Sequence, residues 1–214
     1  MVETMTESTT ETTGTDIAAL RVSPAQHLHE RFAAAEVTGA RNVRLREERF
    51  LAMVGLRLDL ESPARSRVAR AVGADLPAGC GQVGAGDDVA VLWLSPDEFL
   101  LVSETRSASQ IVDATLAALD GTPGAAVDLS ANRTTFRLEG ASARAVLEKG
   151  CPLDLHPRSF RAGTAVVTTI GRVPILLWQV GEQSYRILPR ASFADFLGRW
   201  LIDAMAEFAV LGPV

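Results

Sequence analysis

Residues 87–102 have the sequence DDVAVLWLSPDEFLLV. Two apolar runs flank residues 95–98, Ser-Pro-Asp-Glu, which carry proline at the second position of a tight turn. This pattern predicts two antiparallel strands joined as a hairpin. Ser107 and Gln110 then have the spacing of a helix capping box, and Gly121 ends the helix that they begin.

The same order of elements recurs 86 positions further along the chain. Strands are expected over 173–180 and 184–188, followed by a helix that begins at Ser192. This helix has apolar residues at helical spacing, which predicts the buried side chains Phe193, Phe196, Leu197, Trp200, Leu201, Ala204, Met205 and Phe208. The repeat predicts an α+β fold of two similar halves, each an antiparallel sheet with helices packed on one face.

This repeat divides the chain into three parts. Residues 1–20, rich in threonine and acidic residues, lack an apolar period and are expected to form a disordered tail. The first half covers 21–121 and starts with a short leading helix, for which residues 23–26 (Ser-Pro-Ala-Gln) have a capping-box pattern. The second half covers 122–214.

Composition excludes several classes of partner. The chain has 214 residues, of which 47% are hydrophobic and 22% are charged, and its formal net charge is −5. These values are typical of a globular protein with a self-sufficient core. An acidic chain with no stripe of basic residues lacks the positive surface that holds nucleic-acid phosphates or anionic lipids, so neither nucleic acid nor membrane is expected as a partner.

The cysteine content and the lengths of the apolar runs indicate the cellular compartment of the protein. Cys80 and Cys151 can form at most one disulfide, and they cannot supply a four-thiolate metal site. The apolar runs are far shorter than the ~18 residues that cross a bilayer. The first residues also lack the basic and apolar regions of a secretory signal. A reducing, cytoplasmic location is expected.

Three histidines limit any acid–base chemistry. His27 and His29 lie two positions apart on the leading helix, so their side chains point in nearly opposite directions and cannot share a metal there. His156 could pair with Asp154 and with a distant serine or Cys151 to form a nucleophilic set, but no nucleophile elbow is present in the sequence. Structural histidines and a buried, unreactive Cys151 are the favoured interpretation.

The only lysine and the glycine-rich segment match familiar motifs poorly. Lys149 stands in the last turn of a short helix that Gly150 ends, where a cation complements the helix dipole; a Schiff base would have to form on this residue. Residues 79–84, Gly-Cys-Gly-Gln-Val-Gly, match the dinucleotide pattern Gly-x-Gly-x-x-Gly. No strand precedes this segment and no helix follows it, so it is interpreted as part of a glycine-rich loop that runs to Gly86.

Asp128 and the tryptophans are the other candidates for ligand binding. Asp128 ends a strand before a tight turn, where its carboxylate could hold a polar ligand such as a pterin, or could instead stabilise the turn together with Ser130. Trp93, Trp178 and Trp200 could stack on a flavin or pterin, but tryptophans among apolar neighbours are more often core residues. The sequence therefore assigns no catalytic, cofactor-binding or metal-binding residue.

Several segments together resemble a known family, the gamma subunits of heterotetrameric sarcosine oxidase. The most specific is Lys-Gly-Cys-Pro-Leu-Asp-Leu at 149–155, and others lie in the same order at 94–101, 127–134, 138–147, 160–163, 173–178 and 190–197. Phe99 replaces the tryptophan of the family, and the threonine-rich leader has no counterpart in it. The resemblance covers residues ~42 to ~208.

The resemblance implies a fold and a function. The family fold is similar to part of the folate-binding aminomethyltransferase architecture. The implied function is that of a noncatalytic subunit, docked chiefly on the large alpha subunit beside beta and delta, in a complex that demethylates sarcosine to glycine and yields hydrogen peroxide and 5,10-methylenetetrahydrofolate. FAD, FMN, NAD, zinc and tetrahydrofolate are then expected in the partner subunits. The alternative is a stand-alone, folate-binding domain similar to aminomethyltransferase.

Overall fold

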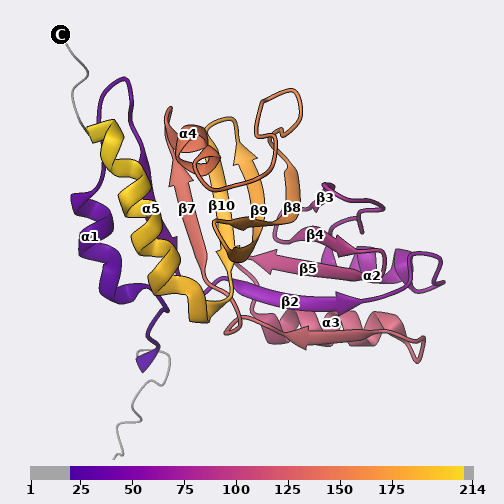
Figure 1. Ribbon diagram of the computed structural model, residues 1–214. Helices are drawn as coiled ribbons and strands as arrows, with labels where there is room; N and C mark the ends of the chain where they lie inside the picture. The colour runs from indigo at the N-terminus through magenta and orange to yellow at the C-terminus, as the bar shows by residue number, and fades with distance from the viewer. Residues whose placement is uncertain (1–19, 210–214) are drawn as a thin grey trace, which may run out of the picture.

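The computed structural model describes residues 20–209, which form two five-stranded antiparallel sheets with helices on their outer faces (Figure 1). The first sheet has the strand order β3-β4-β5-β2-β6 and contains β2 (Ala52–Arg57), β3 (Val83–Ala85), β4 (Ala90–Ser95), β5 (Glu98–Ser103) and β6 (Ala125–Asp128). The second sheet has the order β1-β7-β10-β9-β8 and contains β1 (Arg44–Glu48), β7 (Thr135–Glu139), β8 (Thr164–Ile170), β9 (Val173–Gly181) and β10 (Ser184–Pro189).

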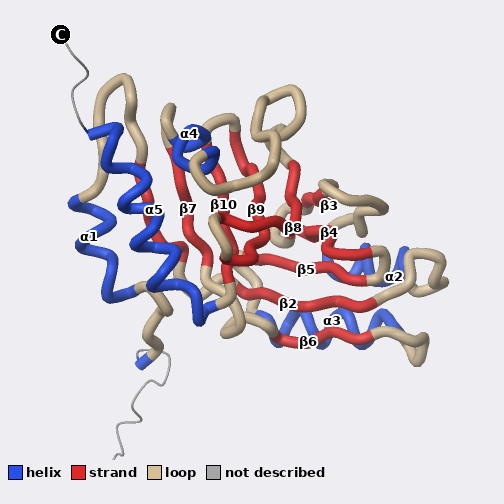
Figure 2. The backbone as a smooth tube through the Cα atoms, in the orientation of Figure 1, coloured by secondary structure: helices blue, strands red, loops and turns tan. Residues whose placement is uncertain are grey.

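The helices belong to separate layers (Figure 2). The first sheet is covered by α2 (Arg65–Val72) and α3 (Ala108–Leu119). The second sheet is covered by α1 (His29–Ala34), α4 (Ala143–Glu148) and α5 (Ala194–Ala209), with the short 3-10 helices η2 (Gln26–Leu28) and η3 (Ala191–Phe193) preceding α1 and α5. The predicted α+β class, with helices on one face of each antiparallel sheet, is confirmed.

The remaining faces of the two sheets meet each other, and their strands run crosswise (Figure 1). The side chains buried between the sheets come from both: Leu51, Met53, Leu92, Leu100, Val102, Ala165, Leu176, Trp178 and Leu188. On β5 the neighbours of these residues, Phe99 and Leu101, point to the helices instead. The central strand β5 is therefore apolar on both faces.

The capping signals of the sequence are confirmed at one helix and not at the other. Ser107 accepts a hydrogen bond from the Gln110 backbone N–H, and the Gln110 side chain accepts one from the Ser107 N–H, which completes the capping box of α3. At the leading helix only half of the predicted box forms, in which the Gln26 side chain accepts from the Ser23 N–H at 3.4 Å. The Ser23 hydroxyl donates to Glu47 at 2.6 Å instead of accepting from Gln26, and the chain forms a 3-10 turn before α1.

Two further expectations are corrected. Phe193 and Phe196 were predicted to be buried but are 37% and 58% exposed, because the core of α5 is a narrower stripe that includes Ala194 and Gly198. The loop expected up to Gly86 contains the short strand β3, which pairs with β4. Gly84 lets the backbone at Asp75 pack closely against β3, since a Cβ there would lie 1.7 Å from the Asp75 carbonyl oxygen.

The sheets do not divide the chain between residues 121 and 122. β1 belongs to the first half by sequence but pairs with β7 in the second sheet, and β6 belongs to the second half but pairs with β2 in the first. The leading helix also packs under the second sheet, through Leu28 and Phe32. Apolar periodicity predicts which face of an element is buried but not which sheet buries it. Apart from Leu20, the predicted tail lies outside the described residues.

Candidate functional site

The carboxylate of Glu47 on β1 is buried and has four polar partners; its side chain is fully enclosed. It accepts hydrogen bonds from the Ser23 hydroxyl at 2.6 Å, the Ala25 N–H at 3.0 Å and the Thr134 hydroxyl at 2.6 Å. His29 Nε2 lies 2.7 Å from the same carboxylate. Burial raises the pKa of Glu47, but these hydrogen bonds together hold it below its ordinary value. The carboxylate thus fastens the N-terminal segment to the second sheet.

A second charged cluster lies on the opposite face of that sheet. Arg46, Arg137 and Arg186 are cross-strand neighbours on β1, β7 and β10. Arg186 is 7% exposed and donates to Glu48 at 2.6 Å and to Glu104, and it also lies over the Trp178 ring. The hydrogen bond and charge of Arg186 lower the pKa of Glu104. Because Glu104 follows β5, this cluster joins the two sheets.

Neither cluster was predicted from the sequence. Glu47 and Glu48 are consecutive residues on a half-buried strand, and nothing in the local pattern indicates that both would be enclosed. Their partners lie far away in sequence, with 87 positions between Glu47 and Thr134 and 138 between Glu48 and Arg186. One local signal exists, because residues along a strand alternate between its two faces, which places Glu47 on the same buried face of β1 as Leu45.

The three histidines are spread over separate contacts, as predicted for structural residues. His27 Nε2 lies 2.7 Å from Asp195 at the surface, and Asp195 also accepts from Arg199. His156 Nδ1 accepts the Arg158 N–H within a loop that the Asp154 carboxylate also stabilises. Hydrogen bonds from Ser159 and from the His156 N–H lower the pKa of Asp154. None of these pairs places a base beside a nucleophile of another element.

Asp128 and the glycine loop have the structural roles that the sequence favoured. The Asp128 carboxylate accepts both the Ser130 N–H at 2.8 Å and the Ser130 hydroxyl at 2.6 Å, which is a turn of the kind expected. The Ser130 hydroxyl also accepts the Met53 N–H, so the turn is tied to β2. Residues 79–84 form a turn that leads into β3, and no helix begins there to receive a pyrophosphate.

The lysine and the cysteines also lie in ordinary structural surroundings. Lys149 is the C-terminal cap of α4; it donates to the Ala204 carbonyl and pairs with Glu207 at 3.2 Å, which links α4 to α5. Cys151 is buried in the core, and Cys80 is exposed. Within residues 20–209, no group of three or more His, Cys, Asp or Glu side chains is arranged to hold a metal ion. No helix in this range is long and apolar enough to cross a membrane.

The tryptophans are core residues or pack beside them. Trp178 is 9% exposed and lies between the sheets, next to Arg186. Trp200 fits so closely against Gly150 that a Cβ there would approach its ring to 2.7 Å. Trp93 is partly buried against the core of the first sheet. None of the three lines the hollow beside Gly84 or the hollow beside Tyr185.

Comparisons with known proteins show the family to which this chain belongs. The model of the sarcosine oxidase, gamma subunit family matches residues 57–207. The sarcosine oxidase subunit gamma of Corynebacterium sp. (strain U-96) is 50% identical over 196 residues, which is 91% of this chain and 94% of that protein. This chain belongs to the sarcosine oxidase gamma subunit family. The resemblance inferred from residues 149–155 and the related segments is confirmed.

Other relatives of this gamma-family chain agree. A sarcosine oxidase subunit gamma from Arthrobacter sp. is 47% identical over 89% of this chain and 92% of that protein. A chain of heterotetrameric sarcosine oxidase from Corynebacterium sp. U-96, solved in complex with pyrrole 2-carboxylate, superposes with a TM-score of 0.87 at 48% identity, over 91% of this chain and all of that chain.

The predicted likeness to part of an aminomethyltransferase is also confirmed at the level of the fold. Aminomethyltransferase T of the glycine cleavage system of Bartonella henselae superposes with a TM-score of 0.60. The match covers 86% of this chain and 57% of that enzyme, at 14% identity. The gamma-family chain therefore has the architecture of part of that enzyme.

Proposed function

We propose that this chain is the noncatalytic structural (gamma) subunit of a heterotetrameric sarcosine oxidase. In this complex sarcosine is oxidatively demethylated to glycine, oxygen is reduced to hydrogen peroxide, and the one-carbon unit passes to tetrahydrofolate as 5,10-methylenetetrahydrofolate. The partners are the alpha, beta and delta subunits, chiefly the large alpha subunit, and the complex is cytoplasmic. FAD, FMN, NAD, zinc and the folate site belong to those partners.

The observation that carries the proposal is the 50% identity, over 91% of the chain, to a protein named as subunit gamma. The noncatalytic role is supported by the contacts of the titratable residues. Glu47, Arg186 and Lys149 each hold two distant segments together, and His27 and His156 take part in separate surface contacts. A catalytic acid or base instead needs to be within reach of a reacting group.

Exposed aromatic side chains give the proposed subunit a surface for its partners. Phe193 on η3 and Phe196 in the first turn of α5 are three positions apart, and both are accessible. Aromatic residues are enriched in the cores of protein interfaces. The Phe193→Asp/Phe196→Asp double variant should therefore fail to assemble, whereas Leu116→Asp on the exposed face of α3 should assemble normally.

Co-expression with the alpha, beta and delta subunits tests the proposal directly. The wild-type chain should copurify with them at fixed stoichiometry, and it should elute as one complex in size exclusion. A chain that elutes as a monodisperse monomer in the presence of all three partners would contradict the structural role. Isothermal titration of the separate chain with tetrahydrofolate tests the alternative of a folate-binding domain, and saturable binding there would favour that alternative.

The noncatalytic role has its own test in the assembled enzyme. Alanine at His27, His29, His156 or Asp128, or serine at Cys151, should leave kcat within a few-fold of wild type. Loss of an acid–base catalyst lowers kcat by about 100-fold or more. One such variant with an intact complex, normal stability and kcat reduced 100-fold would overturn the noncatalytic assignment.

A further inference from the structure

A hollow of about 590 Å³ lies at one end of the second sheet, outside the clusters described above. Its floor contains Tyr185 on β10 and Gln179 on β9, which are paired across the two strands and so emerge on the same face. Its walls come from the turn before α4, the loop before β8 and the turn between β9 and β10. The volume is within the range of small-molecule sites.

Two positive charges border this hollow. Arg144 on α4 and Arg161 in the loop before β8 both line it, and so does Phe160, which is 4% exposed. Arg144 also pairs with Glu148 one helical turn away at 3.4 Å, which leaves part of its guanidinium group for another anion. Glu182 is the one acidic residue that lines the hollow, so arginines outnumber acids around it.

One buried polar atom of the floor has no hydrogen-bond partner among the described residues. Gln179 is 4% exposed; its Nε2 donates to the Glu182 carbonyl at 3.1 Å, whereas its Oε1 has no partner among the described residues. The Tyr185 ring is enclosed, with the residue 2% exposed, but its hydroxyl is open to the hollow and makes no hydrogen bond within residues 20–209. Burial raises the pKa of Tyr185, so the phenol is protonated at neutral pH and acts as a donor. Buried polar groups without partners are uncommon in native proteins.

The walls are fixed by backbone hydrogen bonds from distant segments. The Gly163 N–H donates to the Gln179 carbonyl at 2.7 Å, and the Gly140 N–H donates to the Gln183 carbonyl at 2.9 Å. These bonds hold the loop before β8 and the turn before α4 against β9 and β10. The hollow is therefore preformed, which lowers the entropic cost of binding a ligand.

We propose that this hollow binds a small organic carboxylate that also carries an N–H donor. The carboxylate accepts from Arg144, Arg161 and the Tyr185 hydroxyl, and the N–H donates to Gln179 Oε1. Phe160 packs against the apolar part of the ligand. This binding site is independent of the proposed role in assembly, because all of its residues belong to this one chain.

Three small molecules that differ in one group at a time test the proposed ligand class on the full-length chain. N-acetylglycine has both groups, N-acetylglycinamide lacks the carboxylate, and N-acetylsarcosine lacks the N–H. Amide chemical shifts should saturate with N-acetylglycine at a Kd on the order of 1 mM, and each of the other two should bind at least about tenfold more weakly. Equal binding of all three, or no saturation by N-acetylglycine, would overturn the proposal.

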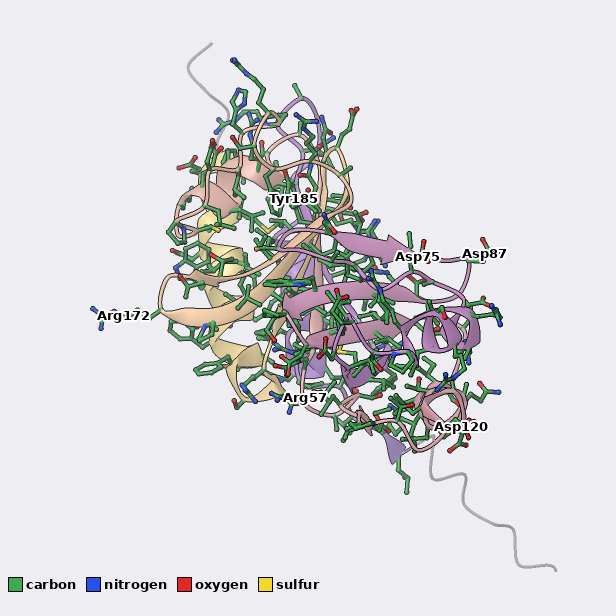
Figure 3. All side chains as sticks on the ribbon, turned by 90° about the vertical axis from the view of Figure 1, so that its right-hand side faces the viewer. Arg57, Asp75, Asp87, Asp120, Arg172 and Tyr185 are labelled. Atoms are coloured by element: carbon green, nitrogen blue, oxygen red, sulfur yellow. The ribbon has the colours of Figure 1, made fainter. Side chains whose placement is uncertain are left out.

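Variants locate the binding. Arg144→Gln and Tyr185→Phe should each raise the Kd for N-acetylglycine by about tenfold. Tyr185→Phe removes a hydroxyl without a protein partner, so the fold should be retained. The matched control is Arg172→Gln, because Arg172 projects from the outer edge of the molecule, away from Tyr185 (Figure 3). Unchanged affinity in both hollow variants would place the probe elsewhere and refute the site. Loss of binding on assembly with the other subunits would also refute it, since a partner segment would then fill the hollow.

Discussion

The two sheets are covered by helices in the same way but differ in what they bury. The polar residues buried in the first sheet and its helices are Ser103 and Thr115, and the Thr115 hydroxyl bonds to the Ile111 carbonyl of its own helix. The second sheet and its helices bury Ser23, Glu47, Thr134, Thr135, Ser142, Gln179 and Arg186. Apart from Gln179 on β9, these polar residues gather where distant segments meet, around β1 and the segment before it.

This difference indicates that the two sheets are held in place by different kinds of interaction. Apolar packing is tolerant of small shifts, whereas a buried carboxylate with four partners accepts only one arrangement of them. We infer that Glu47 specifies which strand occupies the edge of the second sheet, while the first sheet depends on shape and apolar area. Substitutions in the two regions should therefore have different signatures.

The largest loss of stability is expected from Leu101→Ala in the first sheet. Leu101 is fully buried between β5 and the helices, so its truncation leaves a cavity. The free energy of unfolding should fall by about 4 kcal/mol. Leu116→Ala, on the exposed side of α3, should change it by less than about 0.5 kcal/mol in the same urea titration. A loss below about 1 kcal/mol at Leu101 would show that the first sheet does not depend on close packing.

Glu47→Ala should cost about 3 kcal/mol, because two hydroxyls and the Ala25 N–H lose their acceptor. The matched control is Glu30→Ala on the exposed face of α1, which should be nearly neutral. Urea denaturation of both variants measures the difference. Equal stability of the two would mean that the buried carboxylate contributes nothing to the second sheet.

The pH dependence of the free energy of unfolding should also differ between variants of the two sheets. The folded pKa of Glu47 lies below its ordinary value of 4.5, so its contribution is complete above pH 4.5 and is lost as the pH falls through the lowered pKa. Glu104 and Glu139 contribute with the same sign. Glu47→Gln should therefore show a shallower loss of stability in acid than wild type, whereas Leu101→Ala should keep the wild-type slope. Parallel curves of unfolding free energy against pH for wild type, Glu47→Gln and Leu101→Ala would contradict this.

The smallest effect is expected at the cap of α3. Ser107→Ala removes the side-chain acceptor of the Gln110 N–H and should lower the free energy of unfolding by about 1 kcal/mol. Asp113→Ala, on the exposed surface of the same helix, serves as the control. Thermal unfolding of both should show a lower Tm for Ser107→Ala alone.

Local patterns predicted the elements well because their causes are local. The hairpin of β4 and β5, the capping box at Ser107 and the turn at Asp128 each depend on residues within a few positions of one another. The apolar face of α5 was predicted too wide, since helical spacing alone does not show how far the core extends toward Phe193 and Phe196.

What sequence patterns could not predict depends on residues far apart in the chain. The pairing of β1 with β7, the Glu47 contacts and the hollow beside Tyr185 all require segments that meet only in the folded protein. Gln179 lies on an apolar strand, where the sequence gives no sign that its Oε1 would be left without a partner.

The exchange of β1 and β6 between the sheets has a consequence for the folding reaction. Leu45 pairs with Leu138, so the edge of the second sheet closes only after most of the chain has been synthesised. Neither fragment of a chain cut between residues 121 and 122 would contain a full sheet, because each would carry one strand of the other. Such non-local pairing slows folding, because the entropic cost of closing a long loop precedes the stabilising contacts between the strands. We therefore expect one cooperative transition for both sheets, with a folding rate limited by the arrival of β1 beside β7.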